Sequence, residues 1–218
     1  MTQHHNSHLE ALSEIRALME RSSRFISLSG LSGVAAGTIA LVGAAMVYIY
    51  FGIMPFDSKK AYYALMPDAN KWGMNYLTFL LVDATVVLVG ALTAGILFTT
   101  RKARRKGQKI WDPLTQRLLI NLAIPLAAGG IFCLALFTLQ LRGLIAPVTL
   151  IFYGLALVNA SKYTLNDVRY LGISEVVLGL LAMFNLGYGL EFWAIGFGIL
   201  HIVYGMGMYL KYERTEVA

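Results

Sequence analysis

The sequence is poor in charged residues. Asp, Glu, Lys and Arg make up 14% of its 218 residues, against about 25% in typical globular proteins. Hydrophobic residues make up 57%, the mean hydropathy is +0.63, and the apolar residues come in long uncharged runs. A run of about 20 such residues is what it takes to cross about 30 Å of hydrocarbon. The composition therefore excludes an ordinary soluble domain and predicts a membrane protein.

Common site motifs are also missing. The single cysteine, Cys133, excludes an intramolecular disulfide. The sequence has no glycine-rich phosphate loop, no His-Glu-x-x-His and no Gly-x-Ser-x-Gly. Only one histidine falls in an apolar run, so bis-histidine haem ligation is excluded. We therefore expect no cofactor, no bound metal and no set of catalytic residues.

The apolar runs predict an all-α fold with six transmembrane helices. The predicted spans are 26–53, 76–99, 117–141, 144–161, 166–186 and 190–210. Together they form one transmembrane domain over residues 26–210. Before it, an apolar stripe between Leu9 and Arg24 predicts an amphipathic helix within the tail 1–25, and residues 211–218 form a second tail.

The positions of Lys and Arg predict the orientation. With the N-terminus in the cytoplasm, 14 of the 18 Lys and Arg residues fall in inner segments and four in outer segments. Cytoplasmic loops carry such an excess of positive charge. We therefore expect a multi-pass protein of the cell (cytoplasmic) membrane with both termini in the cytoplasm.

The densest basic run lies between the second and third spans. Its members are Arg101, Lys102, Arg104, Arg105 and Lys106. Cations next to a span are typical of a surface that binds anionic lipid headgroups. We expect the inner leaflet of the bilayer to be the partner of this run, and no nucleic acid.

Three ionisable residues lie inside the spans: Asp83, Glu175 and His201. Burying such a group costs at least about 2.5–3.5 kcal/mol near the bilayer centre, so it is usually paired or functional. Glu175 and His201 lie equally far before and after Tyr188, at the centre of a tight turn, which predicts that they meet near the midplane. A carboxylate beside an imidazole suits a ligand or proton site, and the plainer alternative is a polar clamp between two helices.

Asp83 lies about 10 Å from Tyr76, on the outer half of the second span. Small residues follow on its helix face, which predicts that it points inward. Three interpretations stay open: an outward vestibule, a contact with Arg142 or His201, or an unpaired acid kept neutral by burial.

Small and polar residues complete the pattern. Glycines flank both members of the predicted pair at i−3 and i+4, and they recur at four-residue spacing in the first span, which favours close helix packing within the chain or in a homo-oligomer. The helix-packing glycines are Gly33, Gly37, Gly172, Gly179, Gly198 and Gly205. Toward the cytoplasm, Ser29, Asn121 and Asn159 are candidates for an inner mouth.

These observations rank three functions. The first is a small transporter or channel-like protein, proton-linked, with Glu175 and His201 at its centre and Asp83 on the outward side. The second is a non-catalytic membrane subunit or scaffold. The third is an intramembrane enzyme acting on a lipid, with the pair as acid and base; it ranks last because no nucleophile accompanies them.

Overall fold

The computed structural model describes residues 28–57, 70–107 and 110–214. The predicted amphipathic helix with the tail 1–25, and residues 215–218 of the second tail, lie outside these residues. The helices are α2 (Gly30–Phe51), α4 (Tyr76–Arg105), α5 (Pro113–Thr138), α6 (Ile145–Ala160), α7 (Asn166–Phe184), α8 (Gly189–Trp193) and α9 (His201–Tyr212). Short 3-10 turns, η1 (Arg142–Leu144) and η2 (Ser161–Tyr163), flank α6, and a π-helical segment, η3 (Ala194–Leu200), joins α8 to α9.

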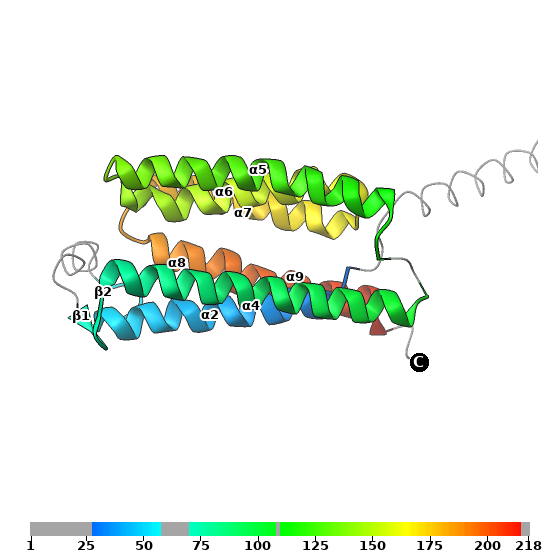
Figure 1. The fold of residues 1–218 in the computed structure, drawn as a ribbon, viewed down its shortest axis with the longest axis horizontal. Coiled ribbons are helices and arrows are strands. Elements are labelled where there is room, and N and C mark those ends of the chain that lie inside the picture. Colours follow the sequence, from blue (N-terminus) through cyan, green and yellow to red (C-terminus); the bar gives the residue numbers. More distant parts are fainter. Residues whose placement is uncertain (1–27, 58–69, 108–109, 215–218) are drawn as a thin grey trace, which may run out of the picture.

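The predicted all-α membrane fold is confirmed. Five helical stretches are long and apolar enough to span a bilayer: α2, α4, α5, α6 with its flanking turns, and the continuous run from α8 to α9. The sixth, α7, has 19 residues, which is about 28 Å of helix. Its mean hydropathy is lowered by Asp167, Arg169 and Glu175. It lies antiparallel to α6 along the bundle (Figure 1).

Two helices extend beyond the predicted spans. The helix α4 continues to Arg105 instead of ending at position 99, so most of the basic run belongs to its last turns. Lys and Arg are good helix formers and are stabilised at a helix C-terminus by the helix dipole. The helix α5 begins at Pro113, because Asp112 caps it by accepting a hydrogen bond from Thr115 N–H at 2.7 Å.

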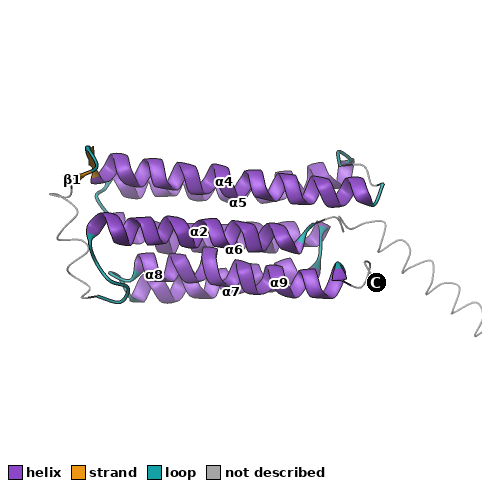
Figure 2. Ribbon diagram, turned by 90° about the horizontal axis from the view of Figure 1, so that it is seen from below, coloured by secondary structure: helices purple, strands orange, loops and turns teal. Residues whose placement is uncertain are grey.

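The helices form two layers. One layer holds α5, α6 and α7, and the other holds α4, α2 and the run from α8 to α9, with α6 and α2 in the middle of their layers (Figures 1 and 2). The main contacts between the layers are made by α8, η3 and α9 against α6 and α7, which we call the layer interface. The molecule therefore consists of two layers of three helices each, which contact each other mainly along one edge.

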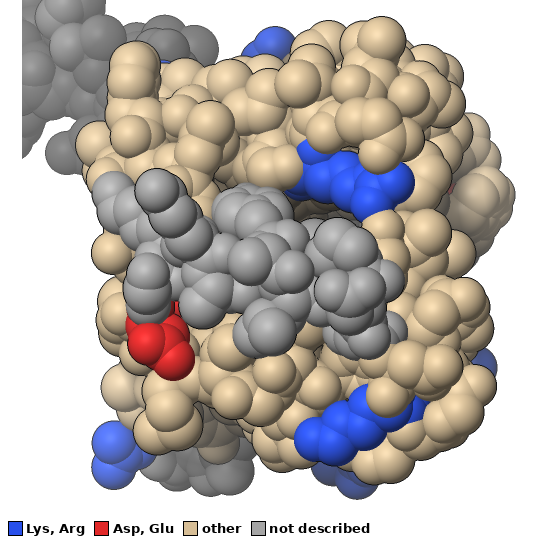
Figure 3. Space-filling model, turned by 90° about the vertical axis from the view of Figure 1, so that its left-hand side faces the viewer, with Lys and Arg blue, Asp and Glu red and all other residues tan. Residues whose placement is uncertain are grey.

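The two ends of the bundle differ. At the basic end, α2 begins, α4 ends and α9 ends; at the hairpin end, a two-stranded hairpin of β1 (Asn70–Lys71) and β2 (Met74–Asn75) precedes α4. The described surface of the hairpin end is mostly uncharged, with Lys and Arg in separate patches (Figure 3).

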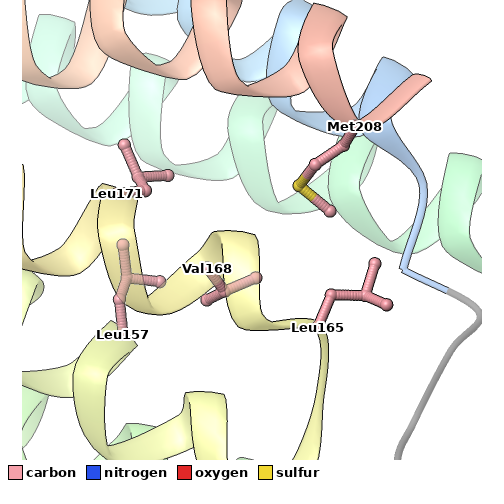
Figure 4. Close-up of a cluster of buried hydrophobic side chains, with 5 residues drawn as sticks. All are labelled: Leu157, Leu165, Val168, Leu171 and Met208. Atoms are coloured by element: carbon pink, nitrogen blue, oxygen red, sulfur yellow. The ribbon is translucent and has the colours of Figure 1, made fainter. Parts of the chain in front are cut away.

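Each end has its own apolar core. Toward the basic end, Leu157 of α6, Leu165, Val168 and Leu171 at the start of α7, and Met208 of α9 converge in the layer interface (Figure 4). Toward the hairpin end, a second core joins α2 to α4 through Val47, Tyr50, Phe51 and Phe79, with the Tyr50 and Phe79 rings stacked at 4.0 Å.

Candidate functional site

Glu175 lies in the middle of α7 and is completely buried, with 0% of its surface exposed. Two glycines on its helix face bring α7 against α6. A methyl group on Gly172 would lie 2.7 Å from Gly154 O, and one on Gly179 would lie 2.9 Å from Pro147 O. Because the two backbones approach so closely, water has no room along this face. The predicted glycine packing thus encloses the carboxyl group.

His201 begins α9, and both of its ring nitrogens have partners. Nδ1 lies 2.9 Å from Gly196 O, and Nε2 lies 2.7 Å from the Tyr153 hydroxyl of α6. A carbonyl oxygen only accepts, so Nδ1 carries a hydrogen and donates to Gly196. In the neutral ring Nε2 then accepts from Tyr153 O–H. A neutral His201 is therefore fully satisfied without help from Glu175.

Glu175 and His201 meet, as their spacing predicts. Glu175 Oε1 lies 3.4 Å from His201 Nδ1, within ion-pair distance. Neither carboxyl oxygen accepts or donates a hydrogen bond among the residues described. A buried polar group without a partner costs about 1–3 kcal/mol, and more if it is charged. The pair is therefore in contact, but the carboxyl group is left unsatisfied.

The π-helical segment η3 shapes the space around the carboxyl group. A methyl group on Gly196 would lie 2.5 Å from Glu175 Oε2 and 2.5 Å from Leu150 Cδ2. Only glycine leaves room here for the carboxylate of the neighbouring helix. The backbone N–H of His201 bonds to Gly198 O, which leaves Gly196 O for the imidazole. Such π segments recur at functional sites in helices.

Aromatic rings extend the cluster toward the hairpin end. Phe197 lies 4.9 Å from the Tyr153 ring and 5.9 Å from the His201 ring, and Trp193 lies 5.0 Å from Phe197. On the other side, Ser174 Oγ is 3.2 Å from the Tyr204 hydroxyl. Polar and aromatic groups of three helices, α6, α7 and the run from α8 to α9, thus converge on one point of the layer interface.

The remaining glycines pack α2 against α9. A methyl group on Gly33 would lie 3.2 Å from Gly205 Cα, and one on Gly37 would lie 2.6 Å from Gly198 O and 3.1 Å from His201 Cβ. The small-residue stripe of the first span therefore packs within the chain and covers the back of His201.

Asp83 lies apart from this cluster. It faces α2, where a methyl group on Gly43 would be 3.4 Å from Asp83 Oδ2. Arg142, one predicted partner, instead donates to the Tyr76 hydroxyl and to Gln140 Oε1. His201, the other, is engaged by Tyr153 and Gly196. Of the three interpretations of Asp83, the contact with Arg142 or His201 is therefore not the one found among the described residues.

The predicted inner-mouth residues fall into two separate places. Asn159 donates to Asn121 O at 2.9 Å, so these two meet between α6 and α5. Ser29 is buried at the start of α2, where its hydroxyl lies 3.3 Å from Glu213 Oε2. Ser29 thus belongs to a helix-end cluster and does not join the asparagines.

That helix-end cluster involves one of the predicted lipid-binding lysines. Lys102 is buried, donates to Leu28 O at 2.8 Å and pairs with Glu213 Oε1 at 3.3 Å. Glu213 Oε1 also accepts from Gly30 N–H at 2.6 Å. Lys102 therefore fastens α4 to the ends of α2 and α9. Arg101, Arg104, Arg105 and Lys106 are exposed, so their binding to lipid stays a prediction.

Three site residues were not predicted from the sequence. Tyr153 was not counted among the in-span titratable groups, Gly196 is not spaced like the packing glycines, and Glu213 lies beyond the last span. A count of in-span hydroxyls at the level of Glu175 and His201 is the one signal that points to Tyr153. Among the described residues, no group of three His, Cys, Asp or Glu side chains could hold a metal ion.

Comparisons with known proteins give no relative for this chain. No protein-family model matches it, and neither a curated protein nor a solved structure resembles it significantly.

Proposed function

We propose that this chain is a small proton-linked membrane transporter whose proton site is formed by Glu175, His201 and Tyr153. The observation that carries the proposal is Glu175, which is completely buried while neither carboxyl oxygen has a hydrogen-bond partner in the part of the chain that the structure describes. A polar clamp that only joined two helices would satisfy both of its members. An acid kept at the cost of an unmade hydrogen bond is typical of a group whose protonation changes during function.

The cluster offers a short path for a proton. Glu175 Oε1 lies 3.4 Å from Nδ1 of His201, which carries a hydrogen in the neutral ring. The free ring nitrogen, Nε2, takes a proton from the Tyr153 hydroxyl at 2.7 Å, and the imidazolium then passes its Nδ1 hydrogen to a Glu175 carboxylate that has approached to hydrogen-bond distance. The Tyr153 oxygen regains a proton from the side from which protons arrive. Charge on both partners appears and disappears together, which limits the cost of burying it.

The two-layer architecture suggests how the site opens. The cluster lies in the layer interface, where most contacts between the two helix layers are made. A small shift of α9 against α6 and α7 separates His201 from Glu175 and exposes the carboxyl group to one side. Intramembrane acids in transporters commonly work in this way, between two bodies that rock against each other.

Flux across liposomes tests the proposal. The purified chain is reconstituted with a trapped pH dye, a potassium diffusion potential drives protons, and a panel of ions and small molecules is supplied in turn. We expect flux above that of empty liposomes, and we expect Glu175→Gln to abolish it. Glu191→Gln is the matched control, because Glu191 lies in α8 and accepts from Phe56 N–H away from the cluster. Equal flux through wild type and Glu175→Gln contradicts the proposal.

The orientation belongs to the same proposal: the basic end lies in the cytoplasm. Ten described Lys and Arg residues lie at this end, and the positive-inside rule assigns them to the cytoplasmic face. They are Arg101, Lys102, Arg104, Arg105, Lys106, Arg117, Lys162, Arg169, Lys211 and Arg214. In a Cys133→Ala background, an impermeant thiol reagent added to cells should label Gly73→Cys at the hairpin end and spare Gly107→Cys. The opposite pattern reverses the orientation.

A membrane subunit is the second candidate, and one observation favours it. Most apolar side chains along α4 and α5 are exposed, among them Leu81 and Leu92 of α4 and Ile131 and Leu134 of α5. Both helices therefore present a continuous apolar face to lipid or to another membrane protein. Crosslinking in native membranes, followed by purification, separates the two candidates: a stable complex through α4 or α5 supports the subunit, and a monomer with flux supports the transporter.

A further inference from the structure

A groove between α2 and α4 has no part in the proton site. It has a volume of about 410 Å³, within the range of about 300–1,000 Å³ typical of small-molecule sites. We call it the Asp83 groove. Its lining is apolar apart from Thr38 and one ionisable group, Asp83. Because several of its lining residues are exposed, among them Val42, Val82 and Val86, the groove opens sideways from the bundle.

Asp83 is a carboxyl group without a partner in this groove. It is half-buried, and among the described residues it makes no hydrogen bond or ion pair. Gly43 leaves room beside it, since a methyl group there would lie 3.4 Å from Asp83 Oδ2 and would clash with Val87. Both helices thus contribute a surface on which an apolar molecule can lie next to one negative charge.

Aromatic rings close the groove at its hairpin end. Trp72 and Phe79 both line it, with ring centroids 5.9 Å apart. The indole of Trp72 already accepts one cation on its face, because Lys71 Nζ lies 5.3 Å from its ring. That lysine is held outside the lining by its hydrogen bond to Ile49 O at 2.8 Å. Aromatic faces attract cations through the negative charge of their π systems.

We infer that the Asp83 groove binds a lipophilic cation, an ammonium or phosphonium centre carried on an apolar body. The apolar walls accommodate the body, Asp83 supplies the opposite charge, and the rings of Trp72 and Phe79 line the hairpin end of the groove. A neutral apolar molecule leaves the carboxylate unpaired, and an anion is repelled by it. The site is separate from the cluster at Glu175 and does not depend on the proposed transport of protons.

Two ions of the same shape and opposite charge test this inference. The whole chain in nanodiscs is equilibrated with labelled tetraphenylphosphonium or tetraphenylborate, and binding to empty nanodiscs is subtracted. We expect saturable binding of tetraphenylphosphonium and none of tetraphenylborate. Asp83→Asn should weaken phosphonium binding about tenfold or more, the loss expected for one close ion pair. Glu191→Gln, which removes a carboxylate at the same end of the bundle, should leave it unchanged.

A second variant keeps the charge and fills the space. Val86→Trp adds bulk at a residue that is 63% exposed and lines the groove, so it should fold normally and weaken binding. Asp83→Asn should also fold, because Asp83 has no partner to lose. Equal binding of both ions, unchanged binding by Asp83→Asn, or no saturable binding to the wild type would each overturn the inference. Equal binding would identify the groove as an apolar lipid contact only.

Discussion

Glu175 and Asp83 are both carboxylic acids in apolar helices, but their surroundings differ in every respect. Glu175 is enclosed by three helices at the layer interface, beside an imidazole 3.4 Å away. Asp83 stands half-buried in a sideways-opening groove between two helices, with no ionic partner among the residues described. The two acids therefore differ in accessibility: Glu175 is enclosed away from water, and Asp83 remains accessible to an external ligand.

The helix contacts around the two acids should differ most in whether they accommodate a methyl group in place of a glycine hydrogen. Gly154→Ala, at the contact of α6 with α7 beside Glu175, should lower the free energy of unfolding by about 2–3 kcal/mol, because the new methyl group would lie 2.5 Å from the Gly172 carbonyl oxygen. Gly90→Ala in α4 should be neutral or stabilise by up to about 1 kcal/mol, since its nearest neighbour is the Ile39 side chain at 3.4 Å.

Unfolding by SDS in mixed micelles measures both free energies. Both variants add one methyl group to a glycine in a helix, and they differ only in how close the neighbouring atoms lie to that methyl group. If Gly154→Ala unfolds like the wild type, α6 and α7 are not held in close contact, and the enclosure of Glu175 loses its basis.

Removing the carboxyl groups should also have different effects. Glu175→Met should raise the free energy of unfolding by about 1–3 kcal/mol, because an unsatisfied buried group is replaced by an apolar chain of similar length. His201 keeps its hydrogen bonds to Gly196 and Tyr153 in this variant. Asp83→Met should change the free energy by less than about 0.5 kcal/mol, since Asp83 is half-exposed.

The same SDS titration decides the outcome, with proton flux as a second readout. A Glu175→Met variant that is more stable and inactive fits a group kept for function at the expense of stability. A Glu175→Met variant that is less stable than the wild type would instead identify a structural ion pair with His201.

The sequence predicts more of the layer interface than of the groove, for a physical reason. Spacing from a tight turn fixes how far two residues lie along adjacent antiparallel helices, which was sufficient to bring Glu175 and His201 together. The glycines at i−3 and i+4 of each residue also predicted that both side chains face a neighbouring helix. Spacing does not fix how a helix is rotated in the bundle, because rotation depends on packing against all neighbours. The sequence therefore left the surroundings of Asp83 open among three interpretations.

Other features depend on irregular backbone or on distant contacts. The π-helical segment that places Gly196 beside Glu175 has no periodic signature in the sequence. In the sequence, Lys102 is one of several cations that follow a predicted span. In the structure it is buried and forms an ion pair with Glu213, which lies far away in the chain. The contact of Lys102 with Glu213 joins two helix ends that lie far apart in the sequence, and it can be predicted only once the helix arrangement is known.

The hydroxyl of Tyr153 offers a finer test of the proton site. Tyr153→Phe removes the donor to His201 Nε2 and should lower the free energy of unfolding by about 1 kcal/mol. Tyr170→Phe is the matched control, because Tyr170 is 60% exposed on α7. Nitrogen-15 NMR of the His201 ring should show the Nδ1–H tautomer in the wild type, and the Nε2 resonance should shift in Tyr153→Phe. An unshifted resonance would mean that the phenol does not contact the imidazole.

A third carboxylic acid, outside the membrane-spanning segments, completes the comparison and carries the smallest effect. Asp112 caps α5, and the hydrogen bond from the Thr115 backbone N–H lowers the pKa of its carboxyl group below the usual value. Because the folded-state pKa is lower than the unfolded one, the cap stabilises the protein above the unfolded pKa, and this stabilisation is lost as the pH falls through the folded pKa. Unlike Glu175, this acid has donors and gains from its charge.

Asp112→Ala should therefore lower the free energy of unfolding by about 0.5–1 kcal/mol at neutral pH, the usual worth of an exposed N-cap. The difference from the wild type should shrink in acid, below the unfolded Asp pKa of about 3.9. Asp112→Asn is the control, since its amide oxygen still accepts from Thr115 and does not titrate, so the difference in stability between Asp112→Asn and Asp112→Ala should not depend on pH. A deficit of Asp112→Ala that stays constant into acid would mean that the charge of Asp112 adds nothing to the cap. The contrast with the donor-free carboxyl group of Glu175 would then rest on hydrogen bonding alone.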